Sequence, residues 1–100
     1  MRFKDKIVLI TGSAGGIGFK TALDFGNEGA IVAVTDIDFE MAKKLSNQII
    51  SNGGIAEPLQ LDVTNLEQTK NVFEVLNQKY GVCDIVFCNA GIREITPCLL

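Results

Sequence analysis

The segment that decides the fold is Thr11-Gly12-Ser13-Ala14-Gly15-Gly16-Ile17-Gly18, which links an apolar run to a helical pattern. So many glycines would weaken a strand or the interior of a helix. In a turn from a strand into a helix, Gly12 permits the tight bend, and Gly15 and Gly16 let a pyrophosphate approach the backbone. Gly18 then lets the helix pack closely on a sheet. The first amides of that helix would face the anion.

Continuous apolar runs mark the expected strands. They cover Ile7–Ile10, Ile31–Thr35 and Ile85–Cys88, and a polar residue follows each of them. Continuous rather than alternating apolar character is typical of strands that are buried on both faces, as in a parallel sheet. A fourth run, Ile55–Leu61, contains Pro58, which cannot donate a backbone hydrogen bond and therefore predicts an edge strand.

Helical patterns separate these strands. The expected helices cover residues 17–28, 39–51 and 64–80, and they stop before Gly29, Asn52-Gly53-Gly54 and Gly81. On the buried side of the second helix we expect Met41, Ala42, Leu45 and Ile49. At the start of the third, Thr64 and Glu67 predict a capping box, because the hydroxyl and the carboxylate can each accept from a backbone amide.

The alternation of strands and helices predicts an α/β fold. Its pattern is that of a Rossmann-type doubly wound parallel sheet, of which this is the first half with strand order 3-2-1-4. Right-handed crossovers place the first two helices on one face of the sheet and the third on the other. We expect residues 1–100 to be the N-terminal dinucleotide-binding portion of a single domain, truncated before its second half.

Asp36 ends the second expected strand, close to the spacing of about 20 residues at which an acid bonds the ribose of a dinucleotide. A carboxylate there accepts from the 2′- and 3′-hydroxyls and repels a 2′-phosphate. Ile37 follows it, and Ser13 and Ala14 supply no cation to the glycine loop. The sequence therefore predicts NAD(H) rather than NADP(H). The alternative is that Asp36 caps the next helix.

Composition excludes several classes of protein. The chain is 47% hydrophobic and 21% charged, as in ordinary globular domains. Its net charge of −3, without a block of Lys or Arg, argues against nucleic-acid binding. No apolar stretch approaches the roughly 18 residues of a membrane span, and no signal-peptide core is present, so we expect a cytoplasmic protein. Without histidine, and with three cysteines lacking metal-ligand spacing, the sequence predicts no metal site.

Two more segments follow strands, at the edge where ligands bind in open α/β sheets. They are Asp62-Val63 and Cys88-Asn89-Ala90-Gly91, and each alone could be a turn or a strand-end cap. Together with the glycine loop and Asp36 they resemble the short-chain dehydrogenase/reductase family over essentially the whole chain. The resemblance implies that the Asp62 side chain and the Val63 backbone contact the adenine ring, and that Asn89-Ala90-Gly91 lines the cofactor.

The resemblance implies hydride transfer between NAD and the carbonyl or alcohol group of a small-molecule substrate, by a full-length protein that forms dimers or tetramers. The expected cofactor-binding residues are Gly12, Ser13, Gly15, Gly16, Ile17, Gly18, Asp36, Ile37, Asp62, Val63, Asn89, Ala90 and Gly91. The family's catalytic Asn, Ser and Tyr-x-x-x-Lys lie beyond the fourth strand, so no catalytic residue is assigned here. Tyr80, the only tyrosine, has no lysine at that spacing and is expected in the core.

The chain departs from the family pattern at three residues. Cys88 replaces the first Asn of Asn-Asn-Ala-Gly, and Lys20 and Leu23 replace small and polar residues of the first helix. Three alternative functions remain open at this point. The glycine loop also has the Gly-x-x-Gly-x-x-Gly spacing of extended sugar-nucleotide epimerases and dehydratases, and an S-adenosylmethionine methyltransferase also has a glycine loop and an acid. The third is a non-catalytic nucleotide-binding module.

Overall fold

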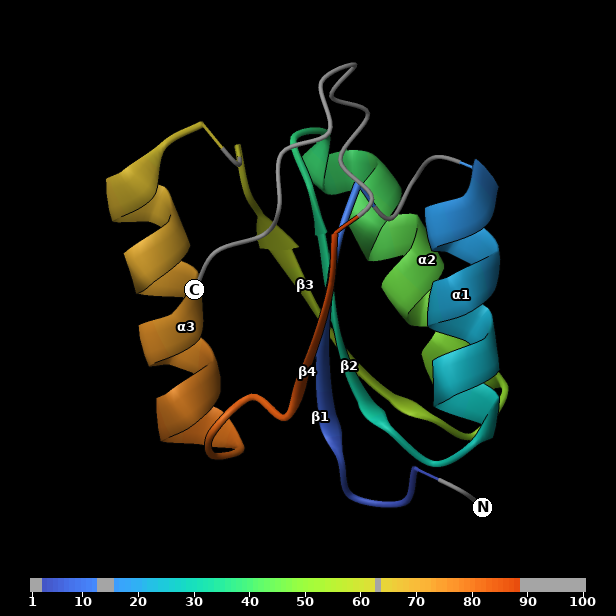
Figure 1. Ribbon diagram of the computed structural model, residues 1–100. Coiled ribbons are helices and arrows are strands. Elements are labelled where there is room, and N and C mark those ends of the chain that lie inside the picture. Colours follow the sequence, from blue (N-terminus) through green and yellow to red (C-terminus); the bar gives the residue numbers. More distant parts are fainter. Residues whose placement is uncertain (1–2, 13–15, 63, 89–100) are drawn as a thin grey trace.

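The computed structural model describes residues 3–12, 16–62 and 64–88 (Figure 1). Strands and helices alternate along this part of the chain. In order they are β1 (Ile7–Thr11), α1 (Gly16–Asn27), β2 (Ile31–Asp36), α2 (Phe39–Ser51), β3 (Ile55–Gln60), α3 (Leu66–Lys79) and β4 (Ile85–Cys88). The strands are parallel, and their order β3-β2-β1-β4 confirms the predicted order 3-2-1-4. None of the described helices combines the length and apolar character needed to cross a membrane.

The strand that contains a proline lies at an edge of the sheet, as predicted. Among the described strands β3 pairs only with β2, and Pro58 lies opposite Val34 in their register. The residues of β3 are partly or fully exposed, whereas those of β1 are all buried. The missing N–H of proline is tolerated here because one side of an edge strand has no ladder to support.

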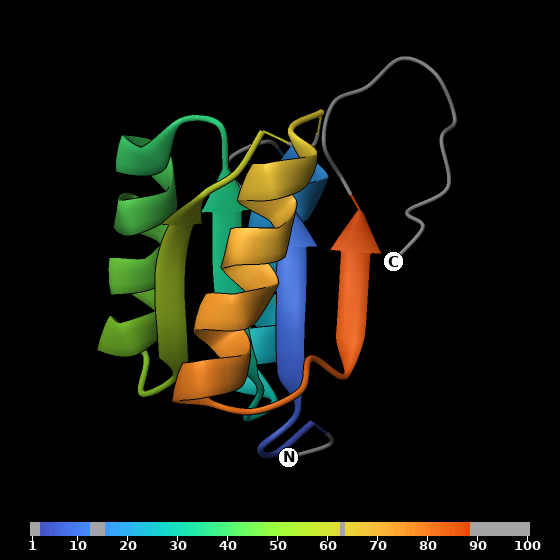
Figure 2. The ribbon, with the colours of Figure 1, turned by 90° about the vertical axis from the view of Figure 1, so that its left-hand side faces the viewer.

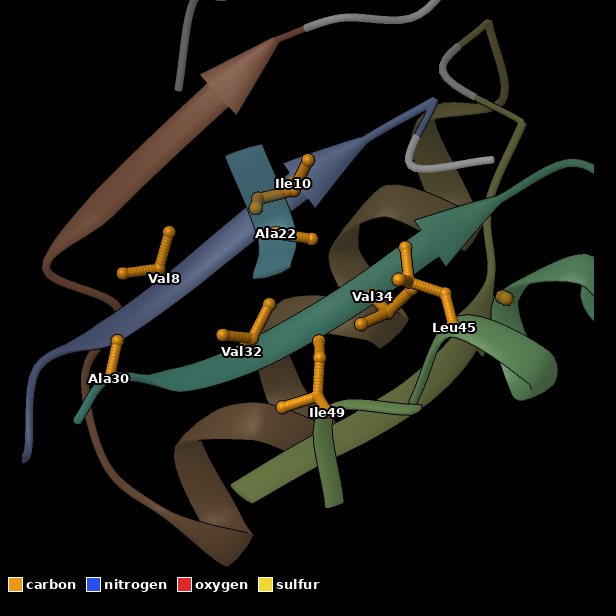
Figure 3. Close-up of a cluster of buried hydrophobic side chains, with 9 residues drawn as sticks. Val8, Ile10, Ala22, Ala30, Val32, Val34, Leu45 and Ile49 are labelled. Atoms are coloured by element: carbon orange, nitrogen blue, oxygen red, sulfur yellow. The ribbon is translucent and has the colours of Figure 1, made fainter. Parts of the chain in front are cut away.

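Helices cover both faces of the sheet, which explains why its central strands, β1 and β2, are almost entirely buried and mostly apolar. α1 and α2 lie on one face and α3 lies on the other, as right-handed crossovers predict (Figures 1 and 2). Val8 and Ile10 point into the cluster under α1 and α2 (Figure 3), whereas Leu9 belongs to the cluster under α3. Successive side chains of β1 are therefore buried on opposite sides, and an alternating pattern would have left one core incomplete.

The buried side of α2 differs from the sequence prediction at one position. Met41 is 39% exposed, and the buried residues are Ala42, Leu45, Ser46 and Ile49. At about 100° per residue, these four residues fall within an arc of about 100°, and Met41 lies about 40° beyond Leu45, outside that arc. Close contact between α1 and α2 also depends on Gly26, where an added Cβ would lie 2.8 Å from the Ile49 Cγ2 atom.

The start of α3 also differs from the prediction. Its N-cap is Asn65, whose Oδ1 accepts from the backbone N–H of Gln68 at 3.0 Å. Thr64 instead donates its hydroxyl to Asp62 Oδ1 at 2.6 Å. The predicted capping box of Thr64 and Glu67 is therefore wrong. The Thr64 hydroxyl is already bonded to the Asp62 carboxylate, and Asn65, one residue later, has a side chain that caps a helix well.

Candidate cofactor-binding site

The described site residues gather at one edge of the sheet, where the strands reach their carboxyl ends (top of Figure 1). Register sets Thr11 of β1 level with Cys88 of β4, and Asp36 of β2 level with Gln60 of β3. From β1 the chain proceeds to β2 and β3 on one side and then returns to β4 on the other. The end of β1 is thus a topological switch point, which is where open α/β sheets bind their ligands.

The glycine loop leaves the sheet at this switch point. Gly12 follows buried Thr11 and has φ 61°, in the left-handed region that favours glycine. Gly16 and Ile17 open α1, and Gly18 is buried within that helix. The first turn of α1 carries no acidic residue, so its amide dipoles can face an anion without a competing charge. The predicted contacts at Ser13 and Gly15 lie outside the described residues.

The second part of the site is Asp36, the last residue of β2. It is 9% exposed, and its Oδ1 accepts from the backbone N–H of Asp38 at 3.0 Å. Its own carbonyl accepts from Leu61 N–H at 3.0 Å, which ties the end of β2 to the chain that leaves β3. Asp38 is the N-cap of α2, with Oδ1 accepting from Met41 N–H at 3.3 Å. The alternative in which Asp36 caps that helix is therefore wrong.

Asp62 lies two residues beyond β3 and closes a turn of its own. Its Oδ1 accepts from both the hydroxyl of Thr64, at 2.6 Å, and the backbone N–H of Thr64, at 3.0 Å. These bonds, the hydroxyl bond foremost, lower the pKa of the Asp62 carboxyl from its ordinary value of 3.8. The backbone N–H of Asp62 donates to Gln68 Oε1, so the first turn of α3 also holds this segment. Val63 lies outside the described residues.

β4 brings its end to the same edge, level with the start of the glycine loop. The predicted contacts at Asn89, Ala90 and Gly91 follow directly and lie outside the described residues.

The thiol of Cys83, near the amino end of β4, donates to the carbonyl of Ile85 at 3.2 Å. Burial raises the pKa of this thiol, so it stays protonated and is a poor nucleophile. No cluster of three or more metal-binding side chains occurs within the described ranges.

Tyr80 lies away from the site. It is the C-cap of α3, and the carboxyl end of that helix lies at the lower side of Figure 1, where the amino ends of the strands also lie. Its ring packs on the cluster under α3, and its hydroxyl donates to Glu57 Oε1 at 3.3 Å. Lys79 donates to the same carboxylate oxygen at 2.9 Å. Burial and this carboxylate raise the pKa of Tyr80. The hydrogen bond from Tyr80 to Glu57 links the end of α3 to β3.

Two residues that touch the site were not predicted as site residues from the sequence. Thr64 could have been found, because Asp followed two residues later by Thr is typical of a side-chain-closed turn. Gln60 donates its Nε2 to the carbonyl of Ile37 at 3.1 Å. That bond joins two segments 23 residues apart and leaves no local pattern in the sequence.

Comparison with known proteins places this arrangement in a family. Residues 6–99 match the family described as short chain dehydrogenase. The chain belongs to the short-chain dehydrogenase family. It is 43% identical over 92 residues to "Probable oxidoreductase EphD" of Mycobacterium tuberculosis (strain ATCC 25618 / H37Rv), a match that covers 92% of this chain and 16% of that protein. Family members of this kind are oxidoreductases, which the sequence predicted.

Solved structures of the family share the fold. A hydroxysteroid dehydrogenase from Escherichia coli superposes with a TM-score of 0.88 at 31% identity, over 99% of this chain and 42% of that one. A protein named as a D-mannonate oxidoreductase, from Haemophilus influenza, has bound NAD (TM-score 0.82, 30% identity, 85% of this chain, 30% of that one). A metagenomic short-chain oxidoreductase is in complex with NADP (TM-score 0.87, 27% identity, 92% of this chain, 42% of that one). The chain spans less than half the length of each of these relatives.

Proposed function

We propose that this chain supplies the cofactor-binding portion of an NAD(H)-dependent oxidoreductase, which transfers hydride between nicotinamide and a small carbonyl or alcohol substrate. The whole protein would act as a dimer or tetramer, as the family resemblance implies. When bound, NAD(H) supplies the hydride or accepts it. The residues of this chain bind and orient that cofactor, and none of them is assigned to the chemical step.

The glycine loop fits the pyrophosphate of such a cofactor. Gly12 turns the backbone with φ 61°, and α1 starts at Gly16 with no acidic side chain in its first turn. Backbone N–H groups at a helix N-terminus stabilise a nearby anion, and the helix dipole adds to them. In this proposal Gly16 also leaves room for the phosphates, because it has no side chain to occupy their place.

The preference for NAD(H) rests on one observation, the Asp36 carboxylate at the carboxyl end of β2. It is 9% exposed and accepts from Asp38 N–H, so it presents a fixed negative charge at the edge of the sheet. A carboxylate accepts hydrogen bonds from ribose hydroxyls and repels a 2′-phosphate. The residues after it, exposed Ile37 and the acidic Asp38, supply no positive charge to offset that repulsion.

Calorimetry on the intact protein tests the proposal, with NADH, NADPH and S-adenosylmethionine as ligands. We expect NADH to bind at least about tenfold more tightly than NADPH, a gap of about 1.4 kcal/mol, and S-adenosylmethionine not to bind. Tighter binding of NADPH by that factor would overturn the cofactor preference. Binding of S-adenosylmethionine in place of both dinucleotides would overturn the proposed activity.

Two glycine substitutions separate cofactor binding from folding. Gly16→Val should abolish NADH binding, because a β-branched side chain would take the place of the pyrophosphate. Gly53→Ala is the control, since Gly53 lies in the turn between α2 and β3, has φ 92° and has open space where a Cβ would be. It should lower the melting temperature through backbone strain and leave the NADH affinity unchanged. Unchanged NADH affinity in Gly16→Val would contradict the role given to this loop.

A further inference from the structure

One peptide group in the loop after β2 is held from both sides. Its carbonyl, that of Ile37, accepts from Gln60 Nε2 at 3.1 Å. Its N–H, that of Asp38, donates to Asp36 Oδ1 at 3.0 Å. The C=O and N–H of a trans peptide lie in one rigid plane and point in opposite directions. An interaction that fixes the carbonyl therefore also aims the N–H at the carboxylate.

Gln60 is well placed to fix that carbonyl. It is the last residue of β3, level with Asp36 in the parallel ladder. The next residue, Leu61, is 4% exposed and donates its N–H to the Asp36 carbonyl at 3.0 Å. The backbone at Gln60 is thus hydrogen-bonded to the strand that carries Asp36. The Gln60 side chain and the Asp36 carboxylate are therefore held at a fixed separation.

The loop itself has little other packing to hold it. Only Ile37 and Asp38 separate β2 from α2, and the Ile37 side chain is 65% exposed. Asp38 is exposed as well, and its side chain is directed to the N-terminus of α2, where it accepts from Met41 N–H. Buried apolar contacts therefore do little to fix the peptide between these residues, and hydrogen bonds carry that role.

We infer that Gln60 is a positioning residue for cofactor selectivity, which acts on the Asp36 carboxylate through the peptide between Ile37 and Asp38. The inference rests on the proposed function, in which that carboxylate accepts from ribose hydroxyls and repels a 2′-phosphate. When the Gln60 donor is removed, the peptide is free to rotate and its N–H leaves Oδ1. The carboxylate then loses the hydrogen bond to its Oδ1 and is held less firmly, so it binds the ribose less well and opposes a phosphate less strongly.

The test is Gln60→Met in the intact protein, because methionine keeps the length of the side chain without its donor. We expect NADH affinity to fall about threefold, the effect of one exposed hydrogen bond, while NADPH affinity stays equal or rises. kcat with saturating NADH should not change. Gln78→Met is the matched control, since Gln78 is exposed on α3 and should leave both affinities as in the wild type.

A double-mutant cycle shows whether Gln60 acts through Asp36. In an Asp36→Ala background, Gln60→Met should change the NADH affinity by less than its effect in the wild type, because the group that it positions is absent. Equal loss of NADH and NADPH affinity in Gln60→Met, or an unchanged ratio of the two, overturns the inference and leaves the proposed function standing. A wild-type protein that binds NADH and NADPH equally well overturns the cofactor preference, and the inference with it.

Discussion

Asp36 and Asp62 follow neighbouring parallel strands at the same edge of the sheet, yet their carboxylates are engaged differently. Asp36 is 9% exposed, and its Oδ1 accepts a backbone N–H from the loop that leads into α2. Asp62 is only partly buried, and its Oδ1 accepts both the hydroxyl and the N–H of Thr64, two residues later. One carboxylate is set into the end of a central strand, and the other closes an exposed turn.

This difference separates two ways in which an acid can serve a binding site. A carboxylate held in a nearly buried position keeps its charge in one place, and a fixed charge discriminates between ligands that differ by a phosphate. A carboxylate in an exposed turn is surrounded by water, which weakens its field, and it acts mainly on the shape of the turn. We therefore expect Asp36 to govern the choice between NAD(H) and NADP(H), and Asp62 to affect both equally.

The largest effect is expected from Asp36→Ala. Loss of the ribose hydrogen bonds should weaken NADH by about tenfold, or about 1.4 kcal/mol, and loss of the negative charge should strengthen NADPH. Calorimetric titration of both cofactors measures the change. Asp24→Ala, at an exposed position on α1, removes the same net charge away from the loop and should leave the ratio unaltered. If both variants shifted the ratio alike, net charge rather than the place of Asp36 would explain the preference.

A smaller and unselective effect is expected from Asp62→Ala. In the proposed site this residue lies at the adenine ring, which NADH and NADPH share, so both affinities should fall together by about threefold. Asp62→Asn keeps an oxygen that can accept from Thr64 and should lose less. A change in the NADH to NADPH ratio after Asp62→Ala would break the distinction between the two acids.

Asp38→Ala tests whether the second acid of the β2–α2 loop contributes through its charge or only as a cap. Its side chain caps α2, and removal of an N-cap costs about 1 kcal/mol of unfolding free energy. Its backbone N–H still donates to Asp36, so the cofactor ratio should not change. Denaturant unfolding and calorimetry measure the two quantities. Asp38→Asn, which keeps a capping oxygen without the charge, should restore most of the stability; a ratio altered in both variants would show that the charge of Asp38 takes part.

The sequence was sufficient to predict the sheet because burial on both faces leaves a plain signal. Val8, Leu9 and Ile10 belong alternately to two cores, so all must be apolar, and the run cannot be mistaken for a half-exposed strand. Pro58 gave the edge position for an equally local reason, its missing N–H. The place of Asp36 at the end of β2 was predictable because the same pattern fixes where that strand ends.

The missed details depend on which of two similar neighbours takes a role. Thr64 and Asn65 are both good capping residues, and the choice follows from Asp62, which accepts the Thr64 hydroxyl and leaves the cap to Asn65. Local patterns do not rank such alternatives. The hydrogen bond from Gln60 to the Ile37 carbonyl was not predictable either, because its acceptor lies in another loop. From the sequence alone, a polar side chain at an exposed strand end that makes such a bond cannot be told from one that only contacts water.

The smallest expected effect concerns the turn at Asp62 and its response to pH. The Thr64 hydroxyl is the main cause that lowers the pKa of the Asp62 carboxyl, so Thr64→Val should move that pKa up toward 3.8, with the backbone N–H of residue 64 still holding it somewhat lower. A carboxyl whose folded pKa lies below its unfolded value stabilises the fold fully above the unfolded value, and that contribution is lost as pH falls through the folded pKa. The melting temperature of Thr64→Val should thus lie slightly below that of the wild type at neutral pH, and the gap should narrow in acid below pH 3.8. Thr69→Val is a suitable control, because the Thr69 hydroxyl donates to the carbonyl of Asn65, the N-cap of α3, and has no carboxylate partner among the described residues. Its effect should therefore not vary with pH. A gap for Thr64→Val that stays constant between neutral and strongly acid pH would show that the hydroxyl shapes the turn without acting on the charge of Asp62.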